Sequence, residues 1–279
     1  MKVRLTTLAE NTTARPATFG EEGLSILIEA GTSIILLDTG QTISVVLNAA
    51  ALGVDLSRVE KIVLSHGHFD HTGGLRSVLR KMRKNVEVVC HPDVWAPKYA
   101  VGKDGAERFI GVPFQRLELE SLGARFAMSK GPVVLAENVT ALGEVPMVND
   151  FETIDPHLFV RDSSGLRADD LLDDRAVVIN SGDGLVVVLG CAHRGIINTL
   201  KQAQKLAGLE RINLVVGGSH LVGSGEERVW QTVAALKELN VERLGLCHCT
   251  SLPAAAILAR EFGDRFFFNN VGKAVEAGQ

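Results

Sequence analysis

The sequence has few aromatic residues, few cysteines and no long apolar run, and each scarcity excludes a class of protein. Phe, Trp and Tyr make up 5% of the residues, too few to predict stacking platforms for single-stranded nucleic acid. Four scattered cysteines in 279 residues do not make a disulfide framework. The longest apolar stretches, such as 185–189, fall far short of the roughly 20 residues that a membrane-spanning helix needs.

The chain also has no surplus of basic charge. Its formal net charge is −4 at pH 7, so it offers no basic field for the phosphates of DNA or RNA, and we expect no nucleic-acid partner. Residues 1–5 lack the apolar core of a signal peptide. We therefore expect a cytoplasmic protein that makes no membrane contact and acts on a small molecule. Nothing in the sequence indicates an oligomeric state.

Apolar runs alternate with helical periodicities, which predicts an α/β fold, and several runs are uninterrupted, as in strands covered on both faces. The expected strands are 25–28, 33–37, 61–64, 86–89, 176–179, 185–189, 214–216, 243–246 and 266–268. The expected helices are 41–52, 195–207, 226–239 and 252–262, with one more that begins near His71 or Thr72.

We expect one domain, 1–279, built from two packed sheet-and-helix halves at roughly 1–90 and 175–279. The segment between them, roughly 91–170, is richer in Pro and Gly and has poor periodicity. Long irregular stretches within compact proteins are typically lids or binding loops.

Three histidines and one aspartate lie within Ser65 to His71, directly after an apolar run. Neutral imidazole nitrogens and carboxylate oxygens are ligands that borderline divalent metals prefer. The carboxyl end of a strand is also where α/β sheets place their ligands. We expect His66 and His68 to reach one metal ion, and Asp70 and His71 to reach a second one about 3.5–4 Å away.

Three other expected strands end in histidine, at His193, His220 and His248. One such histidine is more often structural than a ligand, but three of them beside a multi-histidine turn favour metal binding. We predict His193 and His248 as ligands, and His220 as a ligand, a substrate contact or a residue behind the ligands. His91 and His157 lie in the middle segment and are expected to be ordinary residues, although either can face the cleft.

The triplet Cys247-His248-Cys249 does not have a zinc-finger spacing. Alternate residues of a strand point to opposite faces, so we expect His248 to face one way and both cysteines the other. Asp38 closes another strand, and it either forms a turn before Gly40 or orients a metal-bound imidazole.

The segments Leu37-Asp38-Thr39-Gly40 and Ser65 to Gly74 resemble the metallo-β-lactamase superfamily, whose motif is H-x-H-x-D-H. The resemblance implies a four-layer αβ/βα sandwich with a one- or two-metal site along one edge. It also favours the orienting role for Asp38.

Further segments are similar to one branch of that superfamily, associated with 7,8-dihydropterin-6-methyl-4-(β-D-ribofuranosyl)aminobenzene-5'-phosphate synthase, a transferase. They extend over nearly the whole chain, at 143–146, 150–152, 173–176, 190–199, 217–221 and 248–250. The similarity implies that the insertion at about 91–170 covers the substrate.

The resemblance also assigns the two ligand sets: His66, His68 and His193 for one ion, and Asp70, His71 and His248 for the other. Zinc is the favoured ion, with manganese or iron as alternatives. The superfamily usually has a bridging aspartate where this chain has Cys191. A Cys191 thiolate can bridge softer metals, or its side chain can be a small buried hydrophobe; the two alternatives stay open.

Our first hypothesis is a metal-dependent hydrolase that uses a metal-bound hydroxide, oriented by Asp70, on a small ester, phosphoester or lactone-like substrate. His220 is the second candidate catalytic residue, and no further cofactor is expected.

The alternative follows from the narrower similarity. A transferase of that branch would join a dihydropterin methyl group, carrying a pyrophosphate leaving group, to an aminobenzene ribofuranosyl phosphate. The middle segment would then bind the aromatic partner and the phosphate, with Trp95, Tyr99, Phe114, Lys98, Lys103 and Arg108 as candidates. A metal-binding sensor and a redox di-iron protein are weaker alternatives.

Overall fold

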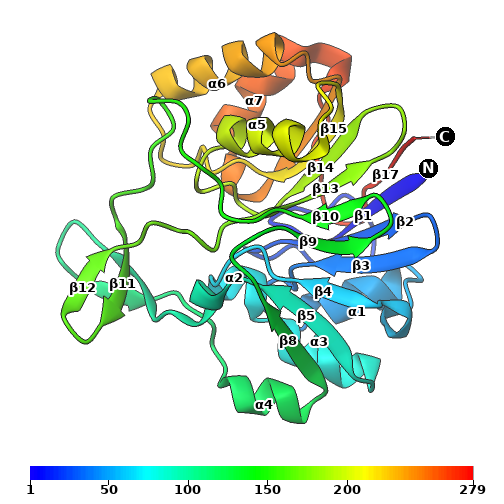
Figure 1. Cartoon of the computed structure of the whole chain (residues 1–279), viewed down its shortest axis with the longest axis vertical. Helices are drawn as coiled ribbons and strands as arrows, with labels where there is room; N and C mark the ends of the chain where they lie inside the picture. Colours follow the sequence, from blue (N-terminus) through cyan, green and yellow to red (C-terminus); the bar gives the residue numbers. More distant parts are fainter. Residues whose placement is uncertain (279) are drawn as a thin grey trace.

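Two β-sheets pack face to face, and helices cover the outer face of each sheet (Figure 1). The structure is a computed structural model and describes residues 1–278. The α/β four-layer αβ/βα sandwich expected from the sequence is confirmed, as one domain of two packed halves.

The first sheet has seven strands in the order β17, β1, β2, β3, β4, β5 and β8. Their bounds are Ala274–Ala277, Val3–Ala9, Ser25–Ala30, Ser33–Leu37, Lys61–Val63, Val86–Cys90 and Ala124–Met128. The core cluster on its outer face joins it to α1 (Ser44–Ala51), α3 (Leu75–Met82), α4 (Arg116–Ser121) and the turn η1 (Leu56–Arg58). In α3 the buried residues are Leu75, Val78, Leu79 and Met82, as the helical spacing predicts.

The second sheet has six strands in the order β16, β15, β14, β13, β10 and β9. Their bounds are Arg243–Cys247, Ile212–Gly218, Leu185–Leu189, Ala176–Asn180, Val139–Ala141 and Val133–Ala136. Its outer face carries α5 (Ile196–Ala207), α6 (Glu226–Glu238) and α7 (Leu252–Phe262). Every residue of β14 is buried, because this central strand is covered on both faces.

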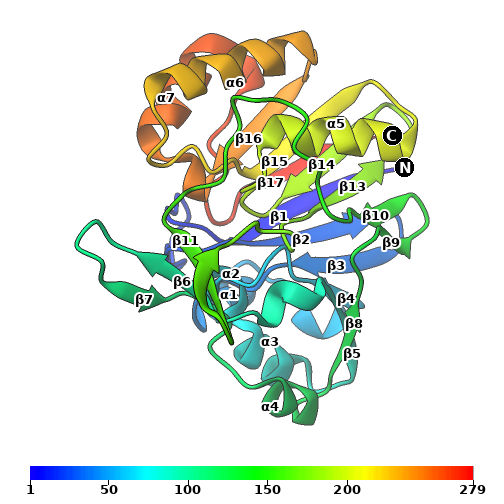
Figure 2. The same cartoon turned by 60° about the vertical axis from the view of Figure 1, so that its left-hand side comes forward.

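A smaller sheet of four strands lies beside the sandwich and comes forward in Figure 2. Its order is β12 (Gly165–Ala168), β11 (Leu158–Asp162), β6 (Lys98–Val101) and β7 (Glu107–Phe109). The expectation of an irregular middle segment is therefore wrong. These strands have three to five residues each and partly exposed side chains, so they leave no long apolar run in the sequence. The expected bounds of the two halves, 1–90 and 175–279, are wrong too, because the middle segment also supplies β8 to the first sheet and β9 and β10 to the second, and β17 joins the first sheet.

Two other sequence expectations also need correction. No strand forms at 266–268, where Phe266 makes only an isolated bridge to Leu244. The helix expected from His71 or Thr72 is divided into α2 (Phe69–Thr72) and α3, with two glycines between them. A Cβ on Gly74 would lie 2.0 Å from the Thr39 carbonyl oxygen, so the chain approaches too closely there for any other residue.

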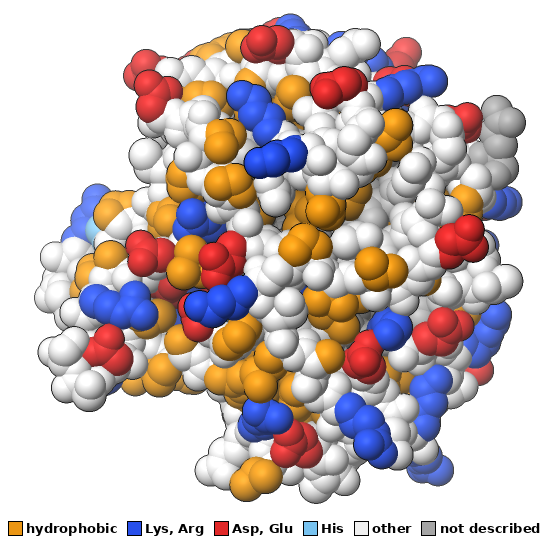
Figure 3. Space-filling model, viewed as in Figure 1, with side chains coloured by type: hydrophobic (Ala, Val, Ile, Leu, Met, Phe, Trp, Pro, Cys, Tyr) orange, Lys and Arg blue, Asp and Glu red, His pale blue; other side chains and the backbone are white. Residues whose placement is uncertain are grey.

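The carboxyl ends of β3, β4, β14, β15 and β16 meet at one edge of the sandwich, where α2 lies next to the four-stranded sheet (Figures 1 and 2). Short segments complete the chain: η2 (Pro92–Trp95), η3 (His248–Thr250) and η4 (Gly263–Arg265). Within residues 1–278, none of the helices has both the length and the hydropathy needed to span a bilayer. Acidic and basic side chains intermingle on the face shown in Figure 3.

Candidate metal centre

The histidine-rich turn connects β4 to α2 and is held tightly in place. The Gly67 N–H donates to Asp173 Oδ2 at 2.8 Å, and a Cβ on Gly67 would lie 2.3 Å from the Val94 carbonyl oxygen. Asp173 in turn accepts a hydrogen bond from Lys98 at 3.0 Å. Hydrogen bonds therefore connect the turn between the first two histidines to Asp173, in the loop before β13, and through Asp173 to β6.

The structure brings together the three histidines of the first predicted ligand set, and we call them the first donor set. His66 Nε2 lies 3.0 Å from His68 Nδ1 and 3.2 Å from His193 Nε2. A tetrahedral zinc ion with bonds of about 2.0–2.1 Å sets its ligand nitrogens about 3.4 Å apart. The three nitrogens therefore stand at close to the spacing that one divalent ion requires.

Asp70, His71 and His248 form a second donor set beside the first. His71 Nε2 lies 3.2 Å from His248 Nε2 and 3.6 Å from Asp70 Oδ2, and the third separation, from His248 Nε2 to Asp70 Oδ2, is 3.4 Å. These distances also match the edges of a tetrahedral site. The donors of both sets thus fit divalent metal ions.

Hydrogen-bonding partners fix the orientation of three of the imidazoles. Asp38 Oδ2 pairs with His71 Nδ1 at 2.7 Å and accepts the Ser65 hydroxyl at 2.6 Å, and Ser65 Oγ lies 2.8 Å from His66 Nδ1. Asn11 Oδ1 lies 2.8 Å from His248 Nδ1. Each of these contacts occupies Nδ1 and leaves Nε2 for the donor set, which is the arrangement that metal-binding histidines need.

Burial and charge act differently on the two donor sets. Burial lowers the pKa of all three imidazoles of the first donor set well below the usual value, so they are neutral and have a lone pair for a cation. Burial also lowers the pKa of His71, but the carboxylates of Asp70 and Asp38 outweigh it and raise this pKa to about 9. A positive charge is thus favoured at the second donor set.

Cys191 and His220 lie next to both sets. Cys191 Sγ is 3.1 Å from His71 Nε2. The same sulfur lies within 4.8 Å of a ring nitrogen of His66 and of a ring nitrogen of His193. The His220 ring is 4.0 Å from the His193 ring, and both of its nitrogens are buried without a hydrogen-bond partner. Its backbone has a φ of 43°, a strained left-handed conformation that turns the side chain toward the site.

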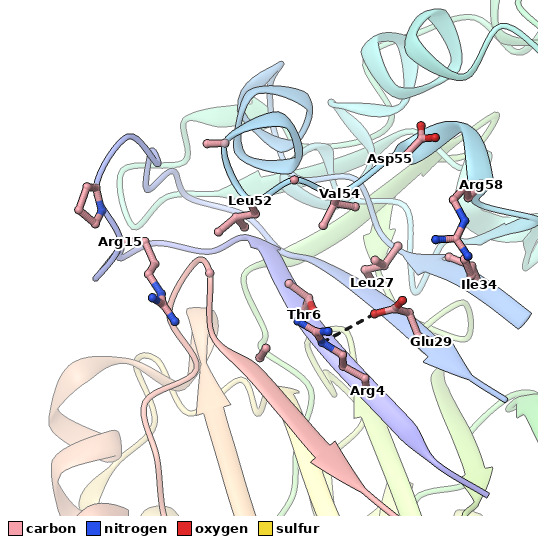
Figure 4. A pocket seen from close by; sticks show the side chains of 15 residues that line it. Arg4, Thr6, Arg15, Leu27, Glu29, Ile34, Leu52, Val54, Asp55 and Arg58 are labelled. Atoms are coloured by element: carbon pink, nitrogen blue, oxygen red, sulfur yellow. Dashed lines mark ion pairs between the residues drawn. The ribbon is translucent and has the colours of Figure 1, made fainter. Parts of the chain in front are cut away.

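A cavity of about 210 Å³ opens onto these groups. His68, Asp70, Cys191, His193, His220 and His248 line it, together with Arg108 and Leu158 from the four-stranded sheet. A larger hollow of about 630 Å³ adjoins it and shares His220 and Val222 with it. Another hollow, of about 620 Å³, lies over the outer face of the first sheet between Arg4, Arg15 and Arg58 (Figure 4) and shares none of its lining residues with the metal centre.

The residues of the middle segment that were expected to bind a substrate do not lie together in the structure. Arg108 lines the cavity and Lys103 lines the adjoining hollow. Lys98, in contrast, is fully buried and pairs with Asp169 and Asp173, so its assignment to a substrate phosphate is wrong.

The aromatic candidates pack against neighbouring side chains. Trp95 meets Phe126, Tyr99 meets Phe109, and Phe114 lies beneath the Arg76 guanidinium. Of the two remaining histidines, His91 is buried against Glu144 and Asp93, and His157 is exposed at the edge of the adjoining hollow.

The expectation that Cys247 and Cys249 share a face is wrong. Strand β16 ends at Cys247, and His248 has a φ of 54°, so the alternation of a strand stops there. Cys249 lines the metal cavity with His248, whereas Cys247 belongs to the core between the sheets. The contact of Asn11 with His248 was not predicted from the sequence, although the polar pair Glu10-Asn11 directly after the strand Val3–Ala9 is a signal for it.

Comparisons with known proteins agree with this geometry. Residues 19–194 match the family model described as the metallo-beta-lactamase superfamily. The solved structure of Tm1679, described as a metal-dependent hydrolase of the beta-lactamase superfamily, superposes with a TM-score of 0.86 at 28% identity, covering 99% of this chain and 100% of that one.

Two relatives come from Methanocaldococcus jannaschii. One is 7,8-dihydropterin-6-methyl-4-(beta-D-ribofuranosyl)-aminobenzene-5'-phosphate synthase, which is 29% identical over 98% of this chain and 96% of its own length. The other is the uncharacterized protein MJ0448, which is 30% identical over 96% of this chain and 98% of its own length.

Proposed function

The chain belongs to the metallo-β-lactamase superfamily, and from that premise we propose that it is a metal-dependent hydrolase of a small ester, phosphoester or lactone-like substrate. The observation that carries the proposal is the convergence of two donor sets beside one cavity of about 210 Å³. The similarity to a protein described as a metal-dependent hydrolase supports it.

The first donor set would hold one divalent ion, and Asp70, His71 and His248 would hold a second one, with Asp38 orienting His71. Zinc suits three imidazoles and a mixed imidazole–carboxylate set, and manganese and iron are alternatives. When bound, such ions supply a water of lowered pKa and polarise a carbonyl or phosphoryl oxygen. Cys191, whose Sγ lies 3.1 Å from His71 Nε2, occupies the sequence position at which the superfamily usually has a bridging aspartate.

Two side chains would act directly on the reactants. Asp70 has one carboxylate oxygen toward His71 and His248, and its position at the cavity wall allows it to accept a hydrogen bond from an attacking water and orient it. His220 presents two unpaired ring nitrogens to the cavity, so it can donate a hydrogen bond to the negative charge that develops on the substrate oxygen.

The experiment is turnover of a panel of small esters, phosphodiesters and lactones by protein loaded with zinc or manganese. We expect His66→Ala to lose both bound metal and activity, because this ring is central to the first donor set. His91→Gln is the matched control, since His91 lies outside both sets. Inactivity of well-loaded protein on the whole panel would refute the hydrolase proposal.

His220 needs a test that separates catalysis from metal binding. We expect His220→Gln to lower kcat by about 10²-fold or more, as for the loss of a donor to a developing oxyanion, while the metal content stays unchanged. Metal analysis alongside kinetics checks this. Loss of metal from this variant would make His220 a ligand and contradict the proposed role.

The second candidate function is the transferase, which the 29% identity to the synthase over 98% of the chain favours. A nitrogen of the aminobenzene ribofuranosyl phosphate would form a bond to the 6-methyl carbon of the dihydropterin. The bond from that carbon to pyrophosphate would break, and the amine would lose a proton. The adjoining hollow of about 630 Å³ supplies the room that a second substrate needs. Product formation from these two substrates, together with no hydrolysis on the panel, would favour this function.

A further inference from the structure

Cys249 lies at the metal cavity although neither donor set includes it. The turn η3 carries its side chain to the cavity beside His248. Its Sγ accepts the N–H of His220 at 3.2 Å and lies 3.6 Å from the carbonyl oxygen of Cys191. Cys249 therefore contacts residues that follow β14 and β15, while it follows β16 itself. These three strands belong to the second sheet, which supplies Cys191, His193, His220 and His248 to the metal centre.

The two cysteines of the centre form one group of sulfur donors. The donor atoms of Cys191, His248 and Cys249 all lie within 4.8 Å of one another. Cys191 Sγ also lies 3.1 Å from His71 Nε2, a ligand atom of the second donor set. Two thiols thus lie beside the second donor set, and Cys191 is also within 4.8 Å of donor atoms of the first set, which itself consists of imidazoles alone.

A glycine makes room for the second thiol. A Cβ on Gly218, at the end of β15, would lie 2.6 Å from Cys249 Sγ and 3.2 Å from the Cα of Cys191. Any larger residue at this position would push the Cys249 sulfur away. The close approach of the two cysteines therefore depends on a missing side chain in the strand between them.

We propose that Cys191 and Cys249 are sulfur ligands of the metal ion held by Asp70, His71 and His248, so that this position selects a thiophilic cation. Thiolate ligands favour zinc and other soft or borderline ions, whereas magnesium and manganese favour oxygen. On binding, each thiol releases its proton to solvent and becomes a thiolate. This inference rests on the proposed metal centre but not on the reaction that the centre performs.

The test is titration of metal-free protein with Co²⁺, because thiolate ligands give cobalt a charge-transfer band in the near ultraviolet that imidazole and carboxylate ligands do not give. We expect this band in the wild-type protein. Cys249→Ser and Cys191→Ser should each lose about half of its intensity, and the double variant should lose all of it. Cys90→Ser is the matched control, because Cys90, the last residue of β5, is buried in the core on the outer face of the first sheet and its replacement should leave the band unchanged.

A second measurement uses the unmodified chain and does not depend on the folding of variants. Cd²⁺-loaded and metal-free proteins are treated with an alkylating reagent, and the modified cysteines are identified by mass spectrometry. We expect Cd²⁺ to slow the alkylation of Cys249 by about tenfold or more, and to protect Cys191 as well.

Several results would overturn the proposal: no charge-transfer band in the wild type, a full band in Cys249→Ser, or equal alkylation of Cys249 with and without Cd²⁺. These outcomes are separate from the test of function. A protein that shows the band but no turnover would contradict only the proposed reaction, and an active protein without the band would contradict only the sulfur ligands.

Discussion

Replacing Asp38 by asparagine should weaken metal binding through the tautomer of a single histidine. Asp38 is completely buried and accepts three hydrogen bonds, from the Ser65 N–H and hydroxyl and from His71 Nδ1. An asparagine has only one acceptor oxygen. If that oxygen keeps the Ser65 N–H, its NH₂ group faces His71 Nδ1, which must then become an acceptor. The proton moves to His71 Nε2, the atom that belongs to the second donor set.

The alternative orientation of the asparagine is no better. Its NH₂ group then takes the place of Asp38 Oδ1, which lies 2.7 Å from the Ser65 nitrogen, so two N–H donors face each other. Loss of a residue that orients a metal-binding histidine typically costs about 10–100-fold in metal affinity, or about 1.4–2.7 kcal/mol. We expect a loss in this range for one of the two ions. The other ion, held by the first donor set, should be less affected, although Ser65 links Asp38 to His66.

Competition for zinc between the protein and a chromogenic chelator measures both affinities. Asp264→Asn is the matched control, because this aspartate is exposed in η4, away from the metal centre. Circular dichroism confirms that both variants are folded before titration. Zinc affinities equal to wild type in the folded Asp38→Asn protein would refute the orienting role of Asp38.

Two other predictions concern buried charges near the centre. Lys98→Met should lower the free energy of unfolding by about 3–5 kcal/mol, because it leaves two buried aspartates without their cation; urea unfolding measures this, and the exposed Lys103→Met should change little. Asp174→Asn should stabilise the metal-free protein by about 4 kcal/mol near pH 8 but not near pH 4, since burial raises the pKa of this carboxyl to about 7. As pH rises from about 3.8 to 7, the unfolded chain has lost this proton while the folded chain keeps it, so wild-type stability falls. Equal pH profiles for the two proteins would contradict this reasoning.

Local sequence predicted the central strands and the strand-end histidines because both depend on short-range patterns. The apolar run 185–189 is a strand with the same bounds, and His193 and His248 lie where the expected strand ends place them. A buried strand needs a continuous apolar run, and its carboxyl end is where a side chain can reach the edge of the sheet. The motif at 66–71 therefore carried most of the information on the site.

The failures have a different physical origin. Cys249 turns into the cavity only because His248 adopts a positive φ, which no spacing rule shows. From the sequence, Lys98 was expected to be available for a substrate phosphate. Its partners Asp169 and Asp173 come from a loop about 70 residues later in the chain. Such contacts depend on tertiary structure, so sequence patterns alone do not reveal them.

The middle segment is also more than a cover over the cavity, because two buried charged contacts tie it to the metal-binding loops. Lys98 in β6 donates a hydrogen bond to Asp173. Asp173 also accepts the N–H of Gly67, which lies between His66 and His68 of the first donor set. Glu152 accepts the N–H groups of Ile197 and Asn198 at 2.8 and 2.9 Å, at the N-terminus of α5 shortly after His193. A carboxylate at a helix N-terminus satisfies free backbone donors and stabilises the helix. A movement of this segment would therefore displace the first donor set from both sides, so the position of the four-stranded sheet and the positions of the proposed metal ligands depend on each other.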